Sequence, residues 1–118
     1  MTVYYKPFTV TGVINTEVKA TETLESTEAE PKKLIGIIVE KNTTAASNDD
    51  FVYVYDEREA VVNGLYRLSI MGENQYYGFI PCDHKIPVGH TVQAANKSGA
   101  TARNIIGGAY VYEITTKT

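Results

Sequence analysis

The chain has 118 residues, 43% hydrophobic and 21% charged, which fits one domain with a buried core and excludes a disordered protein. Its formal net charge of −3 comes from 14 acidic and 11 basic side chains, so no basic face is available for phosphates and we expect no nucleic-acid partner. Because there is one cysteine, no signal-like N-terminus and no run of about 18 apolar residues, we expect no internal disulfide, no cleaved export signal and no membrane insertion.

Short runs rich in Val, Ile, Thr, Tyr and Phe alternate with Gly, Asn, Asp and Pro along the whole chain, and this pattern is typical of strands and turns. Residues 1–7 are a candidate N-terminal arm and residues 42–50 a polar loop. The sequence predicts one all-β domain, an antiparallel sandwich with a jelly-roll-like arrangement of about eight strands. The predicted strands are 8–14, 16–24, 33–41, 51–55, 60–62, 65–71, 76–80, 88–95 and 109–115.

Two segments in the first third of the chain have informative patterns. Residues 21–30 lack an apolar stripe at helical spacing, so we expect an exposed, charged edge strand that leads into a loop ending at Pro31. Residues 34–39, Leu-Ile-Gly-Ile-Ile-Val, are apolar on both faces, which predicts a strand covered on both sides.

The strongest turn signal is Asn63-Gly64 between apolar flanks, which predicts a type I′ hairpin. Gly107-Gly108 precedes a predicted strand, whereas phosphate-binding loops precede helices, so we interpret it as a turn or bulge.

Cys82-Asp83-His84, followed by His90, is the one cluster of potential metal ligands or catalytic groups. Its spacing matches no zinc signature, and neither histidine has an evident partner. We therefore interpret residues 82–86 as a polar loop and expect no metal, no cofactor, no catalytic residue and no enzymatic activity. An enzyme that uses His84 or His90 stays open as an alternative.

Nine tyrosines and no tryptophan are the unusual feature of the composition. A tyrosine combines an apolar ring with a polar tip and suits subunit contacts or sugar platforms. Several aromatic residues recur at strand spacing or lie near the N-terminus, and we expect these to form protein contacts: Tyr4, Tyr5, Phe8, Phe51, Tyr53, Tyr55, Tyr110 and Tyr112.

The C-terminal third contains Ile86-Pro87-Val88-Gly89 before a predicted strand and Tyr110-Val111-Tyr112-Glu113 in a closing strand. This pattern resembles the last strands of small jelly-roll proteins of virus particles and of related trimeric β-sandwich domains. The resemblance implies a sandwich that assembles with copies of itself or docks on other shell proteins. It carries over no catalytic residue.

The leading hypothesis is therefore a non-enzymatic structural protein, an accessory capsid or virion component that acts through protein interfaces and is located in the virion after assembly in the host cytoplasm. The alternative is a carbohydrate-binding sandwich that uses Tyr76, Tyr77 and the Asp49-Asp50 loop.

Overall fold

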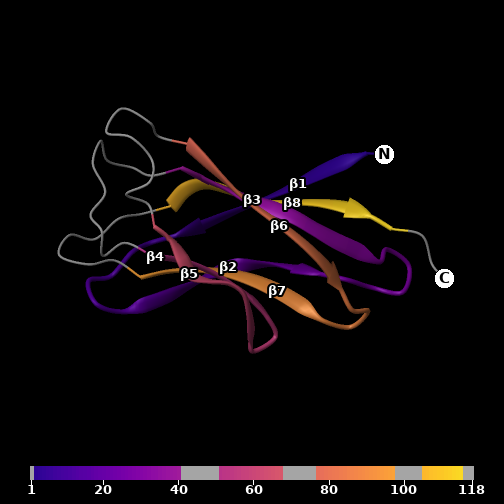
Figure 1. Cartoon of the computed structure of the whole chain (residues 1–118), viewed down its shortest axis with the longest axis horizontal. Coiled ribbons are helices and arrows are strands. Elements are labelled where there is room, and N and C mark those ends of the chain that lie inside the picture. The colour runs from indigo at the N-terminus through magenta and orange to yellow at the C-terminus, as the bar shows by residue number, and fades with distance from the viewer. Residues whose placement is uncertain (1, 41–50, 68–76, 98–104, 116–118) are drawn as a thin grey trace.

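The computed structural model describes residues 2–40, 51–67, 77–97 and 105–115, with the backbone alone for Glu40, Phe51, Tyr77 and residues 62–67 and 105–107. The described residues form eight strands and no helix, in two antiparallel four-stranded sheets packed face to face (Figure 1). The protein is thus an all-β sandwich, as the sequence predicts. Its strands are β1 (Val3–Val10), β2 (Glu17–Glu25), β3 (Lys32–Glu40), β4 (Phe51–Asp56), β5 (Glu59–Arg67), β6 (Tyr77–Ile86), β7 (Thr91–Lys97) and β8 (Ile105–Ile114).

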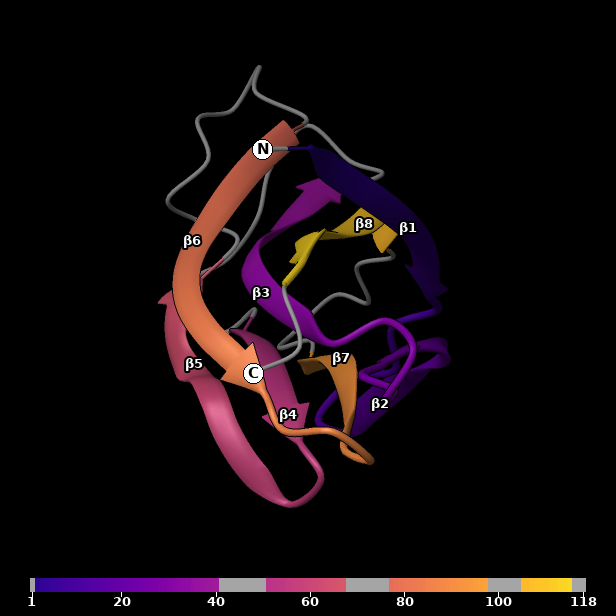
Figure 2. The ribbon, with the colours of Figure 1, turned by 90° about the vertical axis from the view of Figure 1, so that its right-hand side faces the viewer.

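The strand order is nested. The first sheet has the order β1-β8-β3-β6 and the second has β2-β7-β4-β5. The first strand pairs with the last, the second with the seventh, the third with the sixth and the fourth with the fifth, all antiparallel. The end-on view shows the two sheets and the edge strands that flank them (Figure 2). Every connection between successive strands therefore crosses from one sheet to the other, except the β4–β5 connection.

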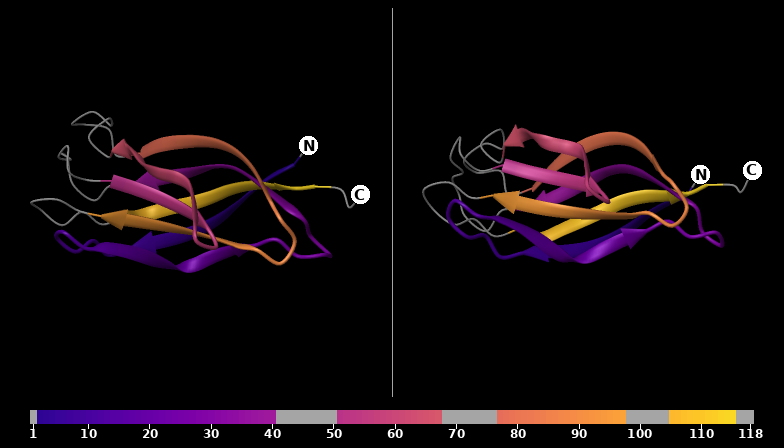
Figure 3. Two further views of the ribbon diagram at one scale, coloured as in Figure 1. Left: turned by 60° about the horizontal axis from the view of Figure 1, so that its bottom comes forward. Right: turned by 90° about the horizontal axis from the view of Figure 1, so that it is seen from below.

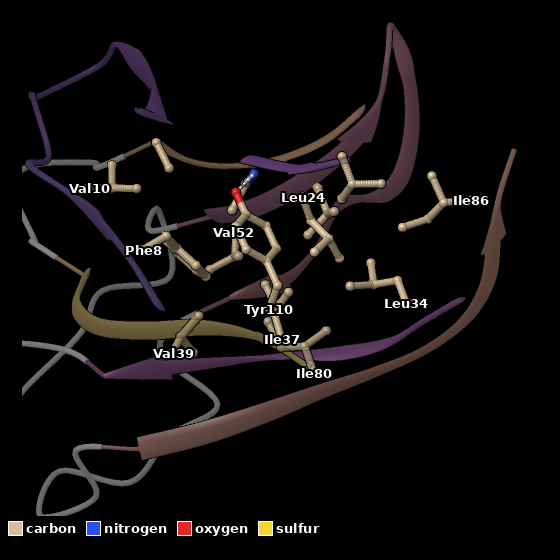
Figure 4. Close-up of a cluster of buried hydrophobic side chains, with 14 residues drawn as sticks. Phe8, Val10, Leu24, Leu34, Ile37, Val39, Val52, Ile80, Ile86 and Tyr110 are labelled. Atoms are coloured by element: carbon tan, nitrogen blue, oxygen red, sulfur yellow. Dashed lines mark hydrogen bonds between the residues drawn. The ribbon is translucent and has the colours of Figure 1, made fainter. Parts of the chain in front are cut away.

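The core lies between the sheets and is filled by the inward face of each strand, since side chains alternate along a strand. Leu34, Ile37 and Ile80 of the first sheet face Leu24 and other apolar residues of the second, all at 4% exposure or less (Figure 4). The other buried apolar side chains at the centre are Phe8, Val10, Ala20, Val39, Val52, Val54, Ile86, Val92, Ala94 and Tyr110.

Tyr110 crosses this core from β8 to the second sheet (Figure 4). The β2–β7 ladder is irregular between Lys19 and Thr23. There the Tyr110 hydroxyl accepts a hydrogen bond from the Ala94 N–H at 2.9 Å and donates one to the Glu22 carbonyl at 2.6 Å. Buried backbone groups need partners, so this hydroxyl replaces a ladder bond that the irregularity removes.

The segments with informative patterns have mixed outcomes. Residues 17–25 form a charged edge strand, β2, and the following turn ends at Pro31, as predicted. The hairpin at Asn63-Gly64 is wrong, because β5 runs through both residues and the turn lies at Glu57-Arg58 instead. The β4–β5 register shifts between Val52 and Tyr53, which places Asn63-Gly64 at a bulge, another position that glycine favours.

Two predicted irregular segments belong to strands. Residues 3–7, the candidate arm, are paired with β8 as part of β1. Residues 82–86, interpreted as a loop, are the second half of β6 and pair with β3. Pro7 and Pro81 lie within β1 and β6, which are both edge strands, where a missing N–H is tolerated. The Gly107-Gly108 bulge fits the register shift between Phe8 and Val10 in the β1–β8 pair.

Candidate functional site

Among the described residues, the outer face of the first sheet includes three rows of four residues, one from each strand. The first row is polar at three of its four positions: Val3, Glu113, Lys33 and Lys85. The other two rows contain no charged residue, and we call their eight members the apolar face: Tyr5, Val111, Gly36 and Pro81 in one row, and Pro7, Ala109, Ile38 and Phe79 in the next. In these two rows the outer face is therefore apolar across all four strands of the sheet.

Exposure varies across the apolar face. The side chains at its two edges are open to solvent, with Tyr5 62% and Phe79 51% exposed. Val111, in the centre, is 5% exposed, because its neighbours on both sides cover it. Scattered exposed apolar residues are ordinary, but a contiguous apolar patch on a sheet usually marks a contact site.

Gly36 forms the floor of the apolar face. A Cβ atom at this position would lie 2.5 Å from Cζ of Phe79 and 2.6 Å from the Ile80 carbonyl oxygen. The Phe79 ring therefore occupies space that a side chain at position 36 would need, and glycine leaves this space free. The prediction that residues 34–39 are covered on both sides is confirmed on the inner side, whereas the cover on the outer side is partial: Phe79 lies over Gly36, and Ile35 and Ile38 are half-buried.

A charged border limits the apolar face. Lys33 Nζ lies 2.6 Å from Asp83 Oδ1. This hydrogen bond, the charge of Asp83 and that of Glu113 together raise the pKa of the Lys33 ammonium. The charges of Lys33, Asp83 and Glu113 thus compensate one another at the border of the apolar face.

The outer face of the second sheet is different, and we call its four linked residues the tyrosine face: Glu17, Lys19, Tyr53 and Tyr55. The rings of Tyr53 and Tyr55 are stacked, with centroids 6.0 Å apart. Lys19 Nζ lies 5.3 Å from the centroid of the Tyr55 ring, and the Tyr55 hydroxyl donates to Glu17. Burial and the Glu17 carboxylate raise the pKa of Tyr55.

The structure divides the eight aromatic residues predicted as contacts. Phe8 and Tyr110 are at most 1% exposed, so their assignment to a contact surface is corrected: their rings pack together in the core with centroids 4.8 Å apart. Tyr4 and Tyr112 stack at 5.6 Å where the inner face emerges from the sandwich. Tyr5 alone belongs to the apolar face, and the Phe51 side chain lies outside the described residues. The sequence prediction missed Phe79, Pro7, Pro81 and Ile38.

The two histidines do have a partner, and it is the same one. Asp56, 7% exposed at the end of β4, lies with Oδ2 2.6 Å from His84 Nε2 and Oδ1 2.8 Å from His90 Nδ1. His84 belongs to the first sheet, whereas Asp56 and His90 lie on the second-sheet side. We call these three residues the Asp56 cluster; it joins the sheets where the chain turns from β6 to β7.

Backbone contacts reinforce this end of the sandwich, where the connections β2–β3, β4–β5 and β6–β7 meet (Figure 3). Ser26 N–H donates to the His90 carbonyl at 3.1 Å, and Gly89 N–H donates to the Ser26 carbonyl at 2.8 Å. Glu57, which has a φ of 58°, exchanges hydrogen bonds with Thr91 through its N–H and its carboxylate. The Asp56 cluster is therefore embedded in a set of mutually bonded turns.

The chemistry that the Asp56 cluster offers is limited by its surroundings. His90, bound through Nδ1, is an oriented imidazole of the kind that a general base requires. The single cysteine of the chain, Cys82, lies on the same face of β6 as His84. Its thiol is half-buried, and burial raises its pKa to about 11, which disfavours the nucleophilic thiolate. Among the residues that the structure describes, no three His, Cys, Asp or Glu side chains are grouped so that they could hold a metal ion. The cluster supplies an oriented imidazole and a link between the two sheets.

Residues proposed for the carbohydrate alternative, the Asp49-Asp50 loop and the side chains of Tyr76 and Tyr77, lie outside the described residues. No helix in the described part of the chain is long and apolar enough to span a membrane. No family model matches the sequence, and neither curated proteins nor solved structures provide a match.

Proposed function

We propose that this protein is a non-enzymatic structural protein of jelly-roll topology that assembles through the apolar face, in the manner of an accessory capsid or virion component. The observation that carries the proposal is the pair of uncharged rows across the first sheet, with Tyr5 and Phe79 exposed. Burying such a face against another protein removes apolar area from water at about 25 cal/mol per Å².

The nested strand order supports the jelly-roll topology. Pairing of β1 with β8, β2 with β7, β3 with β6 and β4 with β5 is what results when one long antiparallel hairpin is rolled into two sheets. Jelly rolls of eight strands occur in viral capsids and in lectins. Fold alone does not assign function, so the apolar face, and not the topology, distinguishes an assembly role from a sugar-binding one.

The properties of the tyrosine face also favour the apolar face as the assembly surface. The Tyr55 hydroxyl is bonded within the chain, and the ring lies under Lys19. These groups are already satisfied, whereas a binding surface gains most where apolar area is still open to water.

The test is the mass of the purified protein by sedimentation velocity and native mass spectrometry between 1 and 100 µM. We expect assemblies of discrete mass, as closed symmetry requires, and we expect the double variant Tyr5→Ser, Phe79→Ser to shift them to smaller species. The matched control is Val13→Ser, Val88→Ser, which removes two exposed apolar side chains outside the apolar face and should leave the masses unchanged. A wild-type chain that is monomeric throughout this range would overturn the proposal.

A further inference from the structure

The two aromatic rings of the apolar face lie over different strands of the first sheet. Tyr5 projects from β1 and is 62% exposed. Phe79 belongs to β6, but its ring lies over β3, because its Cζ atom is 2.5 Å from the position that a Cβ atom of Gly36 would occupy. In the sheet order β1-β8-β3-β6, the two rings therefore alternate with two positions that have no ring, Val111 on β8 and Pro81 on β6.

This row belongs to a regularly paired part of the sheet. Tyr5 pairs with Val111, Val111 with Gly36, and Gly36 with Pro81. The register shifts of these ladders lie before Gly36 and after Phe8, outside the two rows of the apolar face. All eight residues of the apolar face belong to the described part of the chain, side chains included. Regular pairing therefore fixes the positions of the two rings across the sheet.

Rings that alternate in this way are complementary to the rings of a second copy. A two-fold axis along the strands, midway between β8 and β3, exchanges β8 with β3 and β1 with β6. When two apolar faces pack together about this axis, Phe79 of the second copy lies over Val111, and Tyr5 of the second copy lies over Pro81. Four rings then fill four successive positions, each opposite a residue that is not aromatic, so the two layers interdigitate. The same axis keeps the strands of the two packed sheets aligned, as in natural sandwiches.

The charged row beside the apolar face fits the same axis. In strand order this row consists of Val3, Glu113, Lys33 and Lys85. The axis places Glu113 of each copy opposite Lys33 of the other, and Lys85 opposite Val3, so the row brings no like charges face to face. Charges that match in this way fix the orientation of an interface. A two-fold axis across the strands, between the two apolar rows, would move this row away from its counterpart and lose the match.

We propose that the partner of the apolar face is a second copy of this chain, packed face to face about a two-fold axis along the strands, with the Tyr5 and Phe79 rings interleaved. This inference rests on the proposed function and adds the identity of the partner and the symmetry of the contact. At strand spacings of about 4.8 Å and row spacings of about 6.7 Å, the three rows cover roughly 400 Å² on each copy. Such an area is at the lower end for specific interfaces, so we expect a weak dimer that cross-linking at 100 µM captures.

The experiment uses cysteines in the charged row, so that the apolar face stays intact. In a Cys82→Ala background, which has no other thiol, the variants Val3→Cys and Lys85→Cys are mixed and treated with a bismaleimide that spans about 10 Å, the separation of packed sheets. The proposed axis places position 3 of one copy opposite position 85 of the other. Identical positions are three strand spacings and one sheet separation apart, about 17 Å. We therefore expect at least about fivefold more covalent dimer from the mixture than from either variant alone.

The matched control mixes Val3→Cys with Thr9→Cys. Thr9 is an exposed residue of the same strand, beyond the other end of the apolar face. These two positions face each other only if the two-fold axis runs across the strands, so we expect no covalent dimer. Adding Tyr5→Ser and Phe79→Ser to the first mixture should abolish its covalent dimer. Circular dichroism and the melting temperature establish that each variant is folded.

Two results overturn the two-fold packing: a mixture of Val3→Cys and Lys85→Cys that yields no more covalent dimer than the single variants, or cross-linking in the control mixture. Sedimentation of the same samples separates these results from a failure of the proposed function. A mixture that is larger than a monomer at 100 µM but is not cross-linked overturns the two-fold packing alone and leaves the proposed assembly through the apolar face. A mixture that is monomeric at 100 µM overturns both.

Discussion

The two outer faces of the sandwich differ in how their side chains are satisfied. On the tyrosine face, Tyr55 is bonded to Glu17, covered by Lys19 and stacked on Tyr53. On the apolar face, Phe79 rests on Gly36 with half of its surface open to water, and no charged residue occupies either row. The comparison shows that aromatic residues on a sheet can be bonded and covered within their own chain, and our proposal therefore places the interface on the face whose aromatic rings are open to water.

The largest expected effect comes from Tyr110, whose side chain spans the core between the two sheets. Tyr110→Phe leaves the Ala94 N–H and the Glu22 carbonyl without their partner inside the core. We expect a loss of about 2–3 kcal/mol in the free energy of unfolding, measured by urea denaturation. A loss below about 0.5 kcal/mol would mean that the β2–β7 ladder does not depend on this hydroxyl.

Gly36→Ala disturbs the apolar face from below. The added methyl group would overlap both the Phe79 ring and the Ile80 carbonyl, so we expect about 1–3 kcal/mol of destabilisation from overpacking. Combining it with Phe79→Ala removes the overlap with the ring but not the one with the backbone, so the double variant should recover only part of the loss. Full recovery would show that the ring alone requires glycine.

Asp56→Asn tests the connection between the two sheets at the turns. An asparagine replaces one of the two carboxylate oxygens with an NH2 donor and removes the negative charge, so His84 and His90, which approach different carboxylate oxygens, can no longer both donate to residue 56. We expect a loss of about 1–2 kcal/mol and faster amide exchange at Gly89 and Thr91, followed by NMR. Unchanged exchange at both amides would contradict a role for the Asp56 cluster in fastening the β6–β7 turn.

The smallest effect concerns the tyrosine face. Because the pKa of Tyr55 is raised above its ordinary value of 10, the neutral phenol stabilises the fold below about pH 10, and this contribution is lost as the pH rises toward the higher folded value. Tyr55→Phe should therefore change stability by less than about 1 kcal/mol at pH 7 and reduce the loss of stability above pH 10. Identical alkaline melting curves for the two proteins would contradict this account.

Much of the fold follows from local pattern. Alternation and β-propensity identify the class, and the charges of Glu17 to Glu25 identify an edge strand. The sequence could not separate Asn63-Gly64 as a bulge from the same dipeptide as a hairpin turn, because the choice depends on register with β4. Nor could it show that Pro81 lies on an edge, since edges are defined by strand order and not by any one strand.

The candidate surface was less accessible to prediction than the fold. Tyr5 and Phe8 are three residues apart in β1, so strand alternation places Tyr5 on the outer face and Phe8 in the core. The predicted strand began at residue 8, and this difference between the two residues was therefore not recognised. The apolar face joins residues from four strands, and the Asp56 cluster joins residues 28 and 34 positions apart. Such groupings become visible only once the register is known.

The most direct test of the central claim, that the apolar face is an interface, is hydroxyl-radical footprinting of the wild-type protein at 1 and 100 µM. We expect oxidation of Tyr5 and Phe79 to fall at the higher concentration, while oxidation of the exposed Val13 and Val88 stays constant. Equal oxidation of Tyr5 and Phe79 at both concentrations, in samples whose mass has increased, would show that assembly uses another surface and would contradict the claim.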